Sequence, residues 1–132
     1  MIRPLSLALG LALASAPLAA AECHYFWTTD CFEIRNAQTR DISHHVLLSE
    51  QRFRVSRQDE QCPVAVDNQL SIDQRGQALK AFNKQLKRLP GCRQLDSLAP
   101  RVFDTEAEAM AEWQRLSAPR NFKELHLIRR LR

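Results

Sequence analysis

The stretch CHYFWTTDC, residues 23–31, holds two of the four cysteines of this 132-residue chain and three consecutive aromatic residues. Aromatic, β-branched and threonine side chains favour extended backbone, so we predict a strand over residues 24–35. Alternation along a strand puts Tyr25 and Trp27 on the same face as both cysteines. Because the opposite face is also partly apolar, we expect the strand to be covered on both sides or to break near Asp30.

The residues before this stretch have the order of a secretory signal peptide. Arg3 supplies a positive charge, an apolar run extends from residue 5 to about residue 13, and three alanines precede Glu22. The apolar run is shorter than the about 20 residues that span a bilayer. We predict a signal peptide over residues 1–21, cleaved after Ala21, and an exported protein. An uncleaved membrane anchor and lipidation of Cys23 are the less favoured alternatives.

Export decides how the four cysteines are interpreted. In an oxidising compartment, an even number of cysteines indicates a disulfide framework. The sequence contains no C-x-x-C, so neither a redox motif nor a zinc knuckle is indicated. We therefore predict two disulfides among Cys23, Cys31, Cys62 and Cys92. Of the three possible pairings, we favour Cys62 with Cys92 because they bracket a predicted helix. Cys23 and Cys31 could then join only across a turn at residues 28–30.

The remaining elements are predicted from periodicity and from turn residues. Residues 42–55 favour a hairpin or two short strands, and residues 56–63 read as a polar loop whose proline keeps Cys62 extended. Residues 122–132 alternate like a strand, with Leu125 and Leu127 on one face and His126 and Ile128 on the other.

Two helices are predicted from capping signals and apolar stripes. Ser71 and Gln74 have capping-box spacing, and Pro90 with Gly91 ends the apolar stripe that follows. That stripe consists of Leu79, Phe82, Leu86 and Leu89. The second helix is predicted to begin after Asp104 or Thr105, with acidic residues in its first turns. The fold predicted for residues 22–132 is a small single α+β domain with an antiparallel or mixed sheet packed by two helices.

No catalytic motif and no cofactor site is predicted. The sequence has no nucleophile elbow, no H-E-x-x-H and too few glycines for a phosphate loop. Adjacent His44 and His45 would point to opposite faces of a strand, whereas His24 and His126 would meet only if the first and last strands pair. We predict no metal site, and a small hydrolase without a recognisable motif is kept as a minor alternative.

The strongest chemical signal is a run of cations in the first helix. Residues 74–95 contain six basic residues and no acid, and four of them fall on one side of the helix. These are Lys80, Lys84, Lys87 and Arg88. They form either a solvated face or a site for an anionic partner. Tyr25 and Trp27 are candidate interface anchors, with a core position as the alternative.

Small size, export and the missing motifs favour a non-catalytic binding protein. We predict that it engages another protein, as an inhibitor or as an immunity factor in the bacterial periplasm. The alternative is an envelope accessory module that holds an anionic polymer or a membrane surface through its basic helix. Without Arg3 the net charge falls from +4 to +3, which is small for a nucleic-acid-binding protein. No nucleic acid is therefore expected as a partner.

Overall fold

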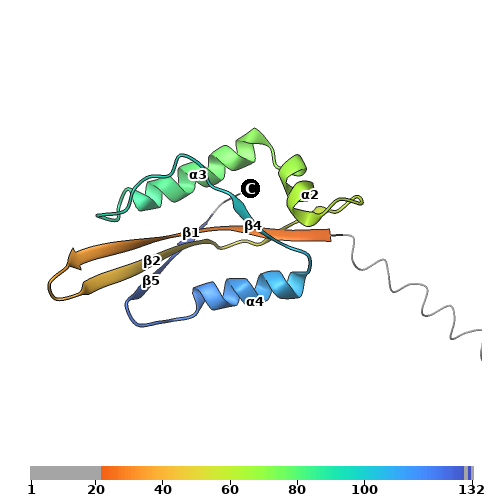
Figure 1. Cartoon of the computed structure of the whole chain (residues 1–132). Coiled ribbons are helices and arrows are strands. Elements are labelled where there is room, and N and C mark those ends of the chain that lie inside the picture. Colours follow the sequence, from red (N-terminus) through yellow and green to blue (C-terminus); the bar gives the residue numbers. More distant parts are fainter. Residues whose placement is uncertain (1–21, 130, 132) are drawn as a thin grey trace, which may run out of the picture.

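A fifteen-residue strand, β1 (Glu22–Asn36), runs through the sheet and contacts three of the other four strands (Figure 1). The computed structural model describes residues 22–129 and residue 131, so the predicted signal peptide lies outside the described residues. The strand is continuous through Asp30, with helices on both sides of the sheet. Of the two alternatives for β1, coverage on both sides is confirmed for its first part, where Tyr25, Phe26 and Trp27 are all buried.

The sheet is mixed, as predicted. Strands β2 (Asp41–Ser49) and β3 (Phe53–Ser56) both pair antiparallel with β1, next to consecutive parts of it. The short strand β4 (Pro100–Phe103) pairs antiparallel with residues 24–27 of β1, and β5 (Lys123–Ile128) pairs parallel with β2. The sequence did not predict β4, because a four-residue strand that begins with proline has too little alternation to be recognised.

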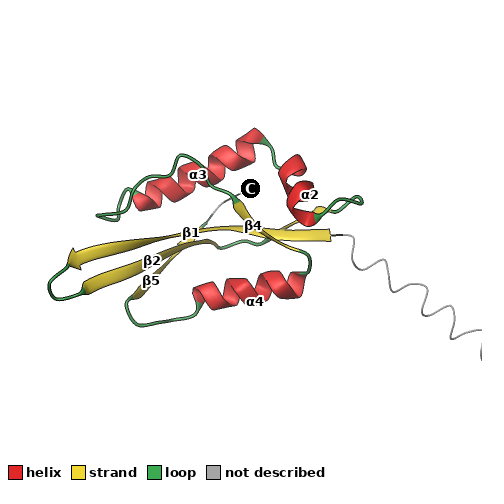
Figure 2. Ribbon diagram, in the orientation of Figure 1, coloured by secondary structure: helices red, strands yellow, loops and turns green. Residues whose placement is uncertain are grey.

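Helices lie on both faces of this sheet (Figure 2). One face carries α2 (Cys62–Gln69) and α3 (Ile72–Leu86), and the other carries α4 (Glu106–Ser117). The α+β class is confirmed and both predicted helices are present; the described residues also form a third, short helix, α2, that was not predicted. The loop predicted over residues 56–63 ends early because Cys62 begins α2. Pro63 stands in the first turn, where its missing N–H has no helical partner to lose.

The two predicted helices begin where their capping residues indicate. Ser71 accepts a hydrogen bond from the backbone N–H of Gln74, and the Gln74 side chain accepts one from the N–H of Ser71. Thr105 caps α4 by accepting from the N–H of Glu108. Each helix buries part of one face, with Phe82 buried from α3 and Ala109 buried from α4. Local sequence thus determines the position of both helices.

The core divides between the two faces of β1. Tyr25 and Trp27 point toward α2 and α3 and belong to a buried cluster with Phe82 and Leu86. On the opposite face Phe26 stacks on Phe103 of β4, with ring centroids 5.4 Å apart. Both faces of the strand are therefore apolar near its start, which explains why its sequence does not alternate.

The two disulfides join Cys23 to Cys62 and Cys31 to Cys92, so the favoured pairing was wrong. Cys23 and Cys31 belong to one straight strand, where eight residues span about 26 Å and no disulfide can form. Each instead reaches a different part of the helical layer, with Cα–Cα distances of 5.4 and 5.8 Å. Disulfides of this kind indicate a non-cytoplasmic protein. Among residues 22–129 no helix is both long and apolar enough to cross a membrane.

We expect Ser71→Ala to destabilise the protein by about 1 kcal/mol, because it removes the hydroxyl that caps α3. The free energy of unfolding is measured by urea titration of the oxidised chain. Ser97→Ala, at an exposed loop position, is the matched control and should change stability by less than about 0.5 kcal/mol. Equal effects of the two substitutions would contradict the capping role of Ser71.

Candidate functional site

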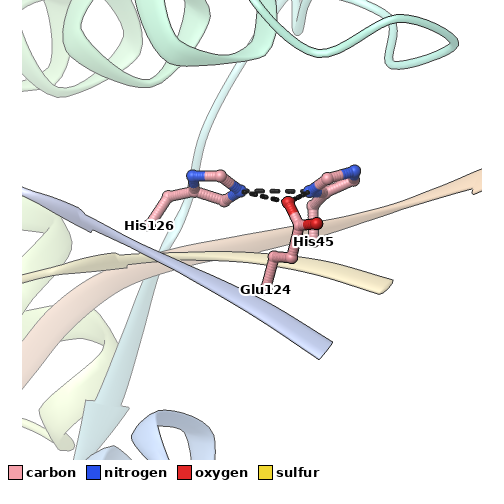
Figure 3. Close-up of side chains that lie close together, drawn as sticks. All are labelled: His45, Glu124 and His126. Carbon is pink, nitrogen blue, oxygen red and sulfur yellow. Dashed lines mark hydrogen bonds and ion pairs between the residues drawn. The ribbon is translucent and has the colours of Figure 1, made fainter. Parts of the chain in front are cut away.

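A cluster of ionisable side chains lies on the face of the sheet that carries α3. At its centre is His45 of β2, which is only 1% exposed. Its Nδ1 lies 3.0 Å from Nε2 of His126, and its Nε2 lies 2.8 Å from a carboxylate oxygen of Glu33. Glu124 places Oε2 3.3 Å from the same Nδ1 (Figure 3). We call His45, His126, Glu33 and Glu124 the histidine cluster.

Strand register brings these four residues together. His45 pairs with Cys31 of β1, so Glu33 follows two positions further along the same face. On its other side His45 pairs with Glu124 of β5, and His126 follows two positions later, again on that face. Three neighbouring strands thus contribute side chains to one spot, beside the disulfide that starts at Cys31.

Two further residues hold the cluster from outside. Gln85 of α3 places its amide nitrogen 3.1 Å from Nδ1 of His126. Arg35 lies between the two carboxylates, 3.6 Å from Glu33 and 3.4 Å from Glu124. The two carboxylates therefore share one guanidinium, and the set carries a net charge of −1 when both imidazoles are neutral.

The contacts form a directional chain of hydrogen bonds. With the Gln85 amide donating to Nδ1 of His126, the proton of that imidazole is on Nε2, which donates to Nδ1 of His45. His45 then carries its proton on Nε2 and donates it to Glu33. Both histidines are neutral in this arrangement, and every ring nitrogen has a partner.

Burial favours the neutral state of His126. Loss of solvation is the largest cause that lowers the pKa of His126, and the neighbouring His45 lowers that pKa further. Glu124 acts in the opposite direction but is the smallest of the three causes. The imidazole lone pair is therefore available over a wider pH range than for a solvated histidine.

The histidine contacts differ from those expected. β2 separates β1 from β5, so the first and last strands do not pair, and His24 lies between β3 and β4 instead. The pattern did predict that His44 and His45 face opposite ways, and His44 indeed lies 3.1 Å from Asp30 on the far side of the sheet. Sequence reasoning missed the meeting of His45 and His126, because it depends on a parallel pairing between distant strands.

A second feature is an exposed apolar surface at the end of the β1–β2 hairpin. Phe32 and Ile34 are 60% and 62% exposed, and Ile42 pairs directly with Ile34 on the same face. Figure 1 shows the turn between β1 and β2 extending beyond the end of α4, which covers this face elsewhere. The Phe32 ring stacks on His44, with centroids 4.4 Å apart. We call Phe32, Ile34 and Ile42 the hairpin face.

Cations lie next to the hairpin face. Arg115 at the end of α4 and Arg120 in the following loop line a pocket with Lys123 of β5, and His44 lines the same pocket. Burial is the main cause that lowers the pKa of Lys123, and Arg120 and Arg115 lower that pKa further by repulsion. Three cations thus lie beside the hairpin face, of which Arg115 is paired with Glu112, whereas no ion pair within the described residues involves Arg120 or Lys123.

The predicted binding residues fall into two groups. The four cations of α3, namely Lys80, Lys84, Lys87 and Arg88, are all exposed. Tyr25 and Trp27 are buried in the core, so they cannot contact a partner at the surface. The structure thus supports the core alternative for both aromatic residues. The hairpin face was not predicted as a surface, because alternation alone does not tell where a covering helix ends.

Comparison with known proteins gives no information on the function of these residues. Comparisons with protein-family models, with curated proteins and with solved structures found no match. Functional inference for this chain therefore depends on the two sites described above and on the basic face of α3.

We expect the metal-free chain to lose stability as pH falls from about 7.5 to 5. The pKa of His126 is lowered in the folded state, so the unfolded chain binds a proton first as pH falls through about 6.5. The stability supplied by neutral His126 is complete above that value and is lost as pH falls through the folded pKa.

Urea unfolding in a chelating buffer at several pH values measures this dependence. His126→Gln should flatten the profile, whereas the control His24→Gln, outside the cluster, should leave its slope unchanged. A His126→Gln profile as steep as that of the unsubstituted chain would contradict the assignment.

Proposed function

We propose that this chain is an exported, non-catalytic binding domain that engages another protein through the hairpin face. The observation that supports the proposal best is the exposure of Phe32 and Ile34, both about 60%, at neighbouring positions of one strand face. Large apolar side chains that gather on a surface favour a partner that removes them from water. Single exposed residues elsewhere, such as Ile72, need no such explanation.

The surroundings of the hairpin face favour an acidic partner segment. Arg115, Arg120 and Lys123 surround the adjoining pocket, whose other lining residues include Val46 and Leu116. A partner that combines apolar side chains with carboxylates would complement both features. The proposed occupant is therefore an apolar and acidic segment of another protein.

The compartment proposed for this interaction is the bacterial periplasm or the cell exterior. Its support is the signal-like residues 1–21, with cleavage after Ala21, together with the two disulfides. A small disulfide-linked protein that covers an acidic segment would act as an inhibitor or as an immunity factor. Masking such a segment requires no catalytic group.

The basic face of α3 supports an alternative function. Lys80, Lys84, Lys87 and Arg88 are exposed, and within the described chain none of the ion pairs involves any of them. Unpaired cations along one helix would attract an anionic envelope polymer or lipid headgroups. In this alternative the chain is an envelope accessory module, and its binding decreases steeply as salt increases.

We expect the substitutions Phe32→Ser and Ile34→Ser, combined, to abolish capture of the partner. The oxidised chain is immobilised, and an envelope extract is passed over it at low salt and at about 0.3 M salt, where screening is strong. The unsubstituted chain should retain one protein at both salts, and a photo-crosslinker placed at residue 34 should label an apolar and acidic segment of it. Both residues are largely exposed, so the cost in stability should be limited to the cross-strand contacts with His44 and Ile42, about 0.2–1 kcal/mol each.

The matched control replaces Lys80, Lys84 and Lys87 by glutamine on the opposite helical layer. This variant should keep the partner at both salts if the hairpin face is the interface. Retention that is lost in the lysine variant but kept in the Phe32 and Ile34 variant would overturn the proposal in favour of the envelope module. Crosslinking of residue 34 to a second copy of the chain, or to lipid alone, would also contradict it.

A further inference from the structure

Three potential metal ligands converge in the histidine cluster. They are Nδ1 of His45, Nε2 of His126 and one carboxylate oxygen of Glu124, all within 4.8 Å of one another. The three separations are 3.0 Å between the nitrogens, 3.3 Å from Glu124 to His45 and 4.0 Å from Glu124 to His126. Figure 3 shows the three groups turned toward a common point.

These separations fit the coordination distances of zinc. A point equidistant from three atoms so arranged lies about 2.0 Å from each of them, close to the 2.0–2.2 Å typical of Zn–N and Zn–O bonds. That point lies in the plane of the three atoms. A tetrahedral zinc site, with ligand–ligand distances of about 3.4 Å, requires Glu124 to move toward His126 from the present 4.0 Å, and the two nitrogens to move apart from 3.0 Å. The Glu124 side chain is half-exposed and can make this adjustment.

Metal binding requires a change of tautomer only at His126. His45 carries its proton on Nε2, bonded to Glu33, so its Nδ1 lone pair, which accepts from His126 in the metal-free chain, can bind an ion once His126 changes tautomer. His126 must carry its proton on Nδ1, and rotation of the Gln85 amide would offer an oxygen to accept it. The proton moves from one nitrogen of His126 to the other, so no proton has to be released.

The outer contacts resemble those that orient zinc ligands in general. A ligating histidine commonly donates its other N–H to a carboxylate, as His45 does to Glu33. Arg35 contacts Glu124 through the other carboxylate oxygen, Oε1, which leaves Oε2 for the ion. With neutral imidazoles, the cluster and Arg35 together have a net charge of −1, which favours the binding of a divalent cation.

We propose that His45, His126 and Glu124 bind one Zn²⁺ ion. Two imidazoles and a carboxylate suit zinc rather than magnesium or calcium, which prefer oxygen ligands. The Glu124 side chain is 49% exposed, so the ion can enter from solvent and keep a water molecule as its fourth ligand. This site is independent of the hairpin face, because His45 points to the opposite side of the sheet from His44.

The proposal is tested by titrating Zn²⁺ into the full chain, exported with its own N-terminal segment and purified oxidised without a histidine tag. We expect one equivalent to bind with a dissociation constant of about 1 µM or tighter and to raise the melting temperature. His126→Gln should weaken binding at least about tenfold, and Glu124→Gln should do the same without affecting the fold. The matched control, His24→Gln, removes a histidine elsewhere in the sheet and should bind as the unsubstituted chain does.

Two results would overturn the zinc site. The first is the absence of stoichiometric Zn²⁺ binding by the unsubstituted chain at about 100 µM metal, far above the expected dissociation constant. The second is binding of unchanged affinity in both His126→Gln and Glu124→Gln, which would locate the ion elsewhere. Circular dichroism of each metal-free variant shows that a loss of binding is not a loss of folding.

Discussion

The double attachment of β1 to one helical layer is the constraint on which the rest of the structure depends. Cys23 and Cys31 lie on the same face of the strand, and their disulfides reach Cys62 at the start of α2 and Cys92 after α3. Each closes a long loop, 39 and 61 residues in sequence separation, which in the chain-entropy model stabilises the fold by about 4 kcal/mol. The strand can neither rotate nor slip by one residue without breaking both links, because a slip would turn the cysteines to the opposite face.

Both candidate sites follow from that fixed strand. On the tethered face, the pairing of Cys31 with His45 holds β2 in register, and the parallel pairing of β5 then brings Glu124 and His126 to the same point. On the other face α4 covers only part of the sheet, so the hairpin end stays exposed. The proposed zinc ion and the proposed protein partner would thus occupy opposite faces of one sheet. Zinc binding would depend on the two imidazoles and partner binding on apolar contact, so a test can exclude one proposal without excluding the other.

The sequence predicted what local interactions determine. The α+β class, the caps at Ser71 and Thr105 and the alternation of β5 follow from residues close together in the chain. The pairing of the disulfides and the β2–β5 ladder connect residues 39 to 81 positions apart, and no local pattern encodes such contacts. The eight-residue helix α2 was missed because it is too short to display a stripe. His45 and His126 were each considered, and no metal site was predicted, because their meeting depends on the topology of the sheet.

A peptide map of the oxidised chain, digested without reduction, tests this account most directly, because both sites depend on how β1 is attached. The account predicts two linked pairs, one joining the peptides of Cys23 and Cys62 and the other those of Cys31 and Cys92, with no free thiol. A peptide that links Cys23 to Cys31, or Cys62 to Cys92, would contradict it. In that case β1 would have to bend near Asp30, and neither the histidine cluster nor the hairpin face would have the arrangement described.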